Sequence, residues 1–360
     1  MKIVTWISNK IRKAARWLHG FFTSLYITPV LQGFFTSLYI TPVLGSGSGY
    51  HTSSRYNDIK LIRHNNIIGN GMHRTGWPWV HDNLKTIHSS EGILFDDFFE
   101  QNFCYKDKPD TYTEPWSTII HHPANIPSFG NHRERLDIAF ESKAFKDSEP
   151  YLKLVFALSD SLADWLRTKL SCKVISLKHP QFLDVKSTWL PGEDKEVYQL
   201  GFYLRNTALC DQIKLPDGVT VKKLWNSLPW LEPYHNKVQS YWEAKGRKTR
   251  RNTECVSFAT PSKYDQILNT KIIIAEYFEA SASNVVLECI SHHTPLIVNR
   301  LPAFEQYLGK EYPLFYDNIN EIPRLIEQAA EGHFYLKTLS TRDLQIDYFL
   351  NKIKEEIYNI

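Results

Sequence analysis

Residues 271–316 read KIIIAEYFEASASNVVLECISHHTPLIVNRLPAFEQYLGKEYPLFY, and they give the clearest indication of the fold. It opens with a continuous apolar run at 272–275, which predicts a buried strand. A loop of small residues at 281–284, a helix at 285–291 and a second apolar strand at 295–299 follow. Strand, loop, helix and strand in this order form one unit of a parallel α/β sheet.

The loop and the helix carry polar groups where such sheets bind their ligands. In parallel α/β sheets, ligands bind beyond the carboxyl ends of the strands, where the free N–H groups of helix N-termini attract anions. Ser283 and Asn284 stand at the start of the predicted helix, and Glu288 lies one turn further on, on the same face as Asn284. The small loop lets a phosphate approach the backbone, and the Glu288 carboxylate can accept hydrogen bonds from a ribose diol.

This pattern resembles the donor-binding half of GT-B glycosyltransferases, particularly the glycosyltransferase family 4 type. The resemblance rests on Glu279, Asn284, Glu288, Thr294-Pro295 and the segment 302–309. Two features depart from the commonest form of the family. Glu279 and Glu288 are nine residues apart rather than eight, and Ala-Ser-Ala-Ser-Asn replaces the usual Gly-Phe-Gly. If Glu279 and Glu288 are not site residues, they are solvated carboxylates at helix ends.

The resemblance covers most of residues 60–340 and implies two Rossmann-like α/β domains facing a cleft. It implies a hexosyltransferase-like enzyme that moves a sugar from a nucleotide-sugar donor to a hydroxyl acceptor, with no metal and no cofactor. Glu288 would bind the ribose and Glu279 the sugar hydroxyls.

The resemblance also places cations beside the donor diphosphate. A strand predicted at 198–204 is closed by Arg205, and Lys222 or Lys223 follows downstream. Fixed cations stabilise the negative charge that the leaving nucleoside diphosphate gains when the glycosidic bond breaks. The alternative for each of these residues is a solvated surface cation.

The first domain offers candidates for the acceptor side. His121 and His122 end a predicted strand at 117–121, and a histidine there can act as a general base because its pKa lies near neutrality. His73 and Arg74 lie in a glycine-rich loop that is not a GxGxxG fingerprint. Asp96-Asp97 follows another predicted strand but lacks the D-x-D spacing, so no metal site is predicted.

Composition limits the class of protein. A length of 360 residues predicts two domains, and a hydrophobic fraction of 42% is sufficient for packed cores. Five scattered cysteines without CxxC spacing favour a reducing, cytoplasmic compartment. A net charge of +3 is too small to indicate nucleic acid as a partner.

The front of the chain, residues 1–49, does not resemble the rest. The twelve-residue segment GFFTSLYITPVL occurs at 20–31 and again at 33–44, and GSGSG follows, which is typical of an added or engineered extension. A natural duplication is the alternative.

The segment before the repeats has the pattern of a basic amphipathic helix that lies in a membrane interface. We therefore expect peripheral membrane contact through residues 1–44, unless this segment is an inert tag or packs on the body.

The remaining boundaries follow from composition. We expect an acceptor domain at 50–180, a linker at 181–196, a donor-nucleotide domain at 197–340 and a C-terminal helix at 341–360. A basic run at 245–251 is interpreted as a solvated helix end or loop, with a membrane-facing patch as the second interpretation.

Two other functions fit the same sequence. A nucleotide-sugar epimerase would share the donor cleft but need no acceptor groove. A non-catalytic GT-B scaffold would use only its basic arm, to hold a membrane or a partner chain.

Overall fold

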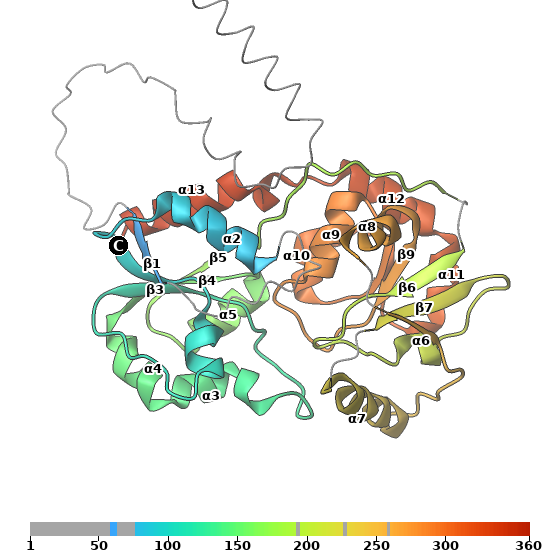
Figure 1. The fold of residues 1–360 in the computed structure, drawn as a ribbon, viewed down its shortest axis with the longest axis horizontal. Helices are drawn as coiled ribbons and strands as arrows, with labels where there is room; N and C mark the ends of the chain where they lie inside the picture. Colours follow the sequence, from blue (N-terminus) through green and yellow to red (C-terminus); the bar gives the residue numbers. More distant parts are fainter. Residues whose placement is uncertain (1–57, 63–75, 192–194, 226–228, 258–259) are drawn as a thin grey trace, which may run out of the picture. The chain divides into compact units, whose positions relative to one another are not determined.

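The described residues build two parallel α/β sheets, each with helices packed on it (Figure 1). The structure is a computed structural model that describes residues 58–62, 76–191, 195–225, 229–257 and 260–360, all within the compact unit Ser53–Ile360. The predictions for residues 1–49, and for His73 and Arg74, lie outside the described residues. No helix in the described ranges is both long and apolar enough to cross a membrane.

The first sheet contains five parallel strands in chain order. They are β1 (Ile59–Leu61), β2 (Ile93–Asp96), β3 (Trp116–Ile120), β4 (Leu152–Ala157) and β5 (Lys173–Ser176).

Both faces of this sheet are buried, which explains the continuous apolar runs in its strands. Side chains of β4 alternate between two cores: Val155 joins one and Phe156 the other. The Val155 core is covered by α3 (Leu136–Glu141), α4 (Lys143–Ser148) and α5 (Asp160–Arg167). The Phe156 core is covered by α2 (Trp77–Leu84) and α13 (Ile346–Tyr358), which lie side by side in Figure 1. The C-terminal helix therefore completes the core of the first domain.

The second sheet contains six parallel strands in the order β11-β10-β9-β6-β7-β8. Strands β6 and β9 are neighbours although they are distant in sequence, so the strand order reverses between them. Such a reversal is the point where open α/β sheets bind ligands. The strands are β6 (Glu196–Gln199), β7 (Thr220–Trp225), β8 (Glu254–Ser257), β9 (Ile272–Ala275), β10 (Leu296–Asn299) and β11 (Phe315–Tyr316). The helices are α6 (Leu209–Gln212), α7 (Leu231–Ala244), α8 (Pro261–Thr270), α9 (Asn284–His292), α10 (Pro302–Leu308), α11 (Ile322–Glu327) and α12 (Ala329–Thr338).

The prediction of two Rossmann-like α/β domains is confirmed, with some corrections to individual elements. The strand predicted at 198–204 exists but is placed too late in the chain: β6 spans Glu196–Gln199, and Gly201 takes a φ of +74°, which an extended strand cannot contain. Arg205 therefore lies in the loop after β6 and does not close the strand. Strands β7 and β8 were not predicted, because the apolar pattern is interrupted by two lysines in β7 and is short in β8, which begins with a glutamate.

Side chains of α10 join the two domains. The Tyr307 hydroxyl donates to the carbonyl oxygen of Leu158 at 2.7 Å and accepts from the amide of His179 at 2.8 Å. The Gln306 amide oxygen accepts from the amide of Asp160, at the start of α5, at 2.7 Å.

Candidate functional site

The loops that follow β6 and β9 are hydrogen-bonded to each other at the point where the strand order reverses. The amide of Asn206 donates to the carbonyl oxygen of Glu276 at 2.7 Å, and the amide of Phe278 donates to that of Leu204 at 2.9 Å. This pairing carries Arg205 opposite Tyr277.

Arg205 lies at the N-terminus of α9. Its Nη2 donates to Ser283 Oγ at 3.2 Å, and its guanidinium carbon lies 4.5 Å from the centre of the Tyr277 ring. Ser283 caps α9 and lies 2.6 Å from the Tyr277 hydroxyl. Arg205 is only 9% exposed, and its buried Nε has no hydrogen-bond partner within the described ranges. The structure thus brings together the predicted Arg205, Ser283 and Asn284, the first residue of α9. A buried cation beside the free amides of a helix start can bind an anion.

Gly201 makes room for this arginine. A Cβ atom at Gly201 would lie 2.2 Å from Arg205 Nη1, and the φ of +74° already disfavours any other residue. Gly218 has the same φ but no neighbour within 4 Å of its added Cβ, so it is a matched control.

We expect Gly218→Ala to lose roughly 1–2 kcal/mol of unfolding free energy through backbone strain alone. Gly201→Ala should lose more, because Arg205 must also move from its place against Ser283 and Tyr277. Denaturant unfolding of both variants measures the difference. Equal losses would show that Gly201 does not set the position of Arg205.

Glu279 and His121 lie where the loop after β9 contacts the first domain. Ser281 Oγ donates to the carbonyl oxygen of His121, and the Glu279 carboxylate is hydrogen-bonded to Asn125. Burial raises the pKa of Glu279 above its ordinary value, although hydrogen bonds from the Ala280 amide and Asn125 oppose the shift. The two residues predicted to be catalytic thus belong to one region of contact between the domains.

The His121 ring is fixed by its neighbours. Its Nε2 lies 3.0 Å from the carbonyl oxygen of Asp97, which can only accept, so Nε2 carries the proton. In the neutral ring the basic nitrogen is therefore Nδ1. The ring packs against Trp77 and Phe98, with centroid distances of 4.0 Å and 4.2 Å.

His122 uses both of its ring nitrogens within the first domain. Nδ1 lies 2.8 Å from the carbonyl oxygen of Glu134, and Nε2 lies 2.8 Å from the Tyr105 hydroxyl. Burial lowers the pKa of His122 below its ordinary value, which disfavours the charged ring. Its proposed acceptor role stays a prediction.

Glu100 holds the backbone of both histidines. Its Oε1 accepts from the amide of His121 at 2.8 Å and from the amide of His122 at 2.7 Å. The carboxylate is completely buried, and Oε2 has no hydrogen-bond partner among the residues that the structure covers. Burial raises the pKa of Glu100 to about 7.

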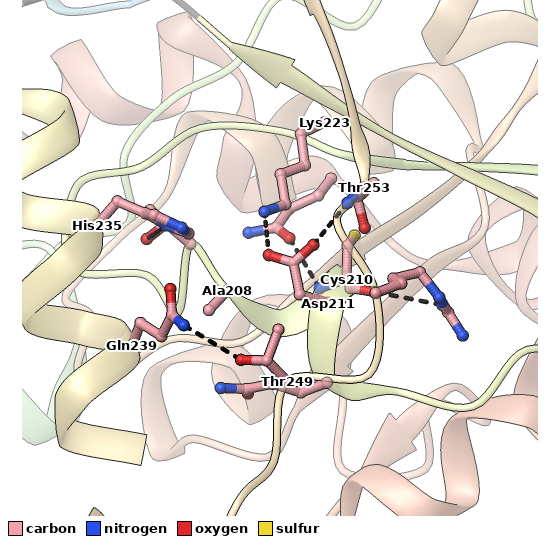
Figure 2. A network of polar contacts seen from close by, with 12 residues as sticks. Ala208, Cys210, Asp211, Lys223, His235, Gln239, Thr249 and Thr253 are labelled. Carbon is pink, nitrogen blue, oxygen red and sulfur yellow. Dashed lines mark hydrogen bonds and ion pairs between the residues drawn. The ribbon is translucent and has the colours of Figure 1, made fainter. Parts of the chain in front are cut away.

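The predicted diphosphate lysines both lie in β7, on opposite faces of the strand, and each is paired with a carboxylate. Lys222 contacts Glu196 at 2.7 Å. Lys223 forms a buried ion pair with Asp211, whose other oxygen accepts from the amide of Thr253 at 2.9 Å (Figure 2). To reach a diphosphate, either ammonium group would have to leave its carboxylate, so both roles stay predictions.

Glu288 is 5% exposed and lies on α9, where its Oε2 accepts from the Tyr264 hydroxyl at 2.6 Å. Its predicted ribose contact stays a prediction.

The Asp96-Asp97 pair is buried in the first domain. Tyr112 donates to Asp96 at 2.9 Å, and Trp77 donates to Asp97 at 2.8 Å.

Comparison with solved structures identifies the fold of this chain. The chain superposes on Anabaena HepE in complex with UDP and glucose with a TM-score of 0.53 at 11% identity, over 79% of this chain and 82% of HepE. It superposes on a Staphylococcus aureus TarM mutant, in complex with fondaparinux, α-GlcNAc-glycerol and UDP, with a TM-score of 0.52 at 13% identity. That match covers 78% of this chain and 58% of TarM. The chain has the GT-B fold. No family model matches the sequence, and no curated protein matches it.

The GT-B arrangement explains why several residues escaped prediction from the sequence. Tyr277 and Asn206 take part in the Arg205 loop only because β6 and β9 are neighbours. Glu100 reaches His121 and His122 across the end of the first sheet. Of these residues, Gly201 could have been noticed in the sequence. A glycine within an apolar run often marks a place where another group approaches the backbone closely.

Proposed function

We propose that this protein transfers a sugar from a nucleotide-sugar donor to a hydroxyl acceptor, as an enzyme of the glycosyltransferase family 4 type. One observation carries the proposal: the buried Arg205 guanidinium lies against Ser283 at the start of α9, where β6 and β9 reverse the strand order. The HepE and TarM structures that share the fold contain UDP. We therefore infer that the donor carries a nucleoside diphosphate.

The roles follow from charge and position. Arg205 and the amides at the start of α9 would stabilise the diphosphate as it leaves, without the help of a metal ion. Glu288 would bind the ribose, and Glu279 would contact the sugar hydroxyls. His121 would accept the proton of the acceptor hydroxyl through Nδ1. Residues 1–44 would hold the enzyme at a membrane surface in the cytoplasm.

Titration calorimetry with UDP, GDP and ADP tests the donor site. We expect Arg205→Ala to weaken binding of the preferred nucleotide by about 10- to 100-fold, because a charge-assisted hydrogen bond contributes roughly 1.5–3 kcal/mol. Arg324→Ala removes an exposed arginine on α11 and should leave affinity unchanged.

Two results would count against the proposal. If wild-type protein bound none of the three nucleotides, the donor site would be refuted. If Arg205→Ala bound them as tightly as Arg324→Ala, the site would lie elsewhere. Binding with no transfer of sugar to any acceptor extract would instead favour the epimerase or an acceptor absent from the extracts.

A further inference from the structure

A cavity of about 380 Å³ lies in the second domain, formed by residues that the donor site does not use. Three segments meet there: the end of α6, the loop after α7 and the turn after β11. The lining residues are Gln212, Gly246, Arg247, Lys248, Arg250, Asp317, Asn318, Ile319 and Asn320.

The lining is positively charged. It includes three cations and one carboxylate, and that carboxylate, Asp317, already lies 3.7 Å from Arg300. Arg247 is also neutralised, since its Nη1 contacts Glu276 at 2.6 Å. Lys248, by contrast, has no ion-pair partner among the described residues, and Arg250 uses only Nε, which donates to the carbonyl oxygen of Gln212 at 2.9 Å. Two cations therefore remain available to a ligand.

A buried donor in the cavity wall also lacks an acceptor. Gln212 is 1% exposed, and its Oε1 accepts from Asn206 at 2.9 Å. Its Nε2 is buried without a hydrogen-bond partner in the described part of the chain. Because this nitrogen is fully buried, it does not open onto the cavity, and a ligand would be held by the two available cations.

We propose that this cavity binds a small phosphate monoester at a site separate from the donor site. Lys248 and Arg250 would pair with the phosphate, since arginine and lysine both bind phosphate oxygens well. The side-chain amides of Asn318 and Asn320 would then face the rest of the ligand. The volume lies in the usual range for small-molecule sites and exceeds what one phosphate needs, which leaves room for an attached sugar or glycerol.

The basic run at 245–251, read from sequence as a solvated helix end or loop, thus contributes four residues to the cavity lining, and two of them are the available cations. The same phosphate monoester chemistry occurs in soluble sugar phosphates and in the headgroup of phosphatidic acid. The experiment therefore needs one measurement with a soluble phosphate monoester and another with lipid vesicles.

The test uses the full chain and glycerol 3-phosphate as the probe, measured by titration calorimetry. We expect Lys248→Gln/Arg250→Gln to weaken binding at least tenfold. The control Lys237→Gln/Lys263→Gln removes the same charge from exposed lysines on α7 and α8 and should bind like wild type. Affinity for UDP should be the same in all three proteins.

Sedimentation with vesicles of phosphatidylcholine, with and without phosphatidic acid, separates the two sources. Weaker sedimentation of the cavity variant than of the control would assign the lipid headgroup. Equal sedimentation, with loss of glycerol 3-phosphate binding, would assign a soluble ligand.

Two outcomes would overturn the proposal. In one, the probe fails to bind wild-type protein or binds the cavity variant and the control equally. In the other, the cavity variant loses UDP affinity together with the probe, which would make the cavity part of the donor site. The Arg205→Ala variant completes the comparison, because it should lose UDP and keep the probe even if sugar transfer is never observed.

Discussion

Lys223→Ala is expected to lower the unfolding free energy by about 3–5 kcal/mol, because it leaves the Asp211 carboxylate buried without its cation. The two side chains of this ion pair are 6% and 7% exposed, so water cannot replace the ammonium group. The Asp211 carboxylate also accepts from the amide of Thr253 (Figure 2), and the amide of Arg250 donates to the main-chain carbonyl oxygen of Asp211. Guanidinium unfolding at neutral pH measures the loss.

Lys222 is the matched control for Lys223, since it is the neighbouring residue of the same strand. Its ion pair with Glu196 is more exposed, at 27% and 21%, and Lys271 contacts the same carboxylate at 2.8 Å. Lys222→Ala should therefore cost only about 0–1 kcal/mol. In the double variant Lys223→Met/Asp211→Asn, most of the lost stability should return, because both charges are removed at nearly constant volume and the asparagine oxygen still accepts from the Thr253 amide.

The same variants decide between a structural and a functional role for Lys223. If Lys223→Ala unfolds at the same denaturant concentration as Lys222→Ala but no longer binds UDP, the lysine serves the diphosphate. A large loss of stability, with UDP affinity restored in the double variant, would assign it to the core.

Glu100→Gln is expected to remove a large pH dependence of stability. The pKa of Glu100 rises from 4.5 in the unfolded chain to about 7 in the folded protein, so between these values the folded state binds more protons. Its contribution to stability is complete below pH 4.5 and is lost as the pH rises through 7. A shift of this size corresponds to about 3 kcal/mol.

Glutamine keeps an oxygen to accept from the amides of His121 and His122 but carries no charge to bury. We expect Glu100→Gln to gain about 3 kcal/mol over wild type between pH 4.5 and pH 8, measured by urea unfolding at several pH values. Histidines and other acids titrate in both proteins, so they largely cancel in the difference. Parallel stability profiles would show that Glu100 is not protonated in the folded state at neutral pH.

The sequence predicted the second half of the donor domain well, because the apolar runs and the small-residue loop there all indicate the same strand–loop–helix–strand unit. The apolar run of β9 was placed correctly, and the start of α9 missed by one residue because Asn284 is already helical. The first-domain strands were found to within a few residues, since a parallel sheet buried on both faces needs long apolar runs. The strand before Arg205 was placed wrongly because a positive φ at Gly201 leaves no periodic signal.

Sequence patterns alone were enough for the α/β class, the positions of most strands along the chain and the small-residue loop that leads into α9, because each depends on residues close together in the chain. Which distant groups meet became visible only in the folded structure. It set Arg205 against Ser283 and Tyr277, paired Lys223 with Asp211 and placed Glu100 under two histidine amides. Those contacts depend on the order of strands in the sheets, and strand order is set by packing between segments that no local pattern connects.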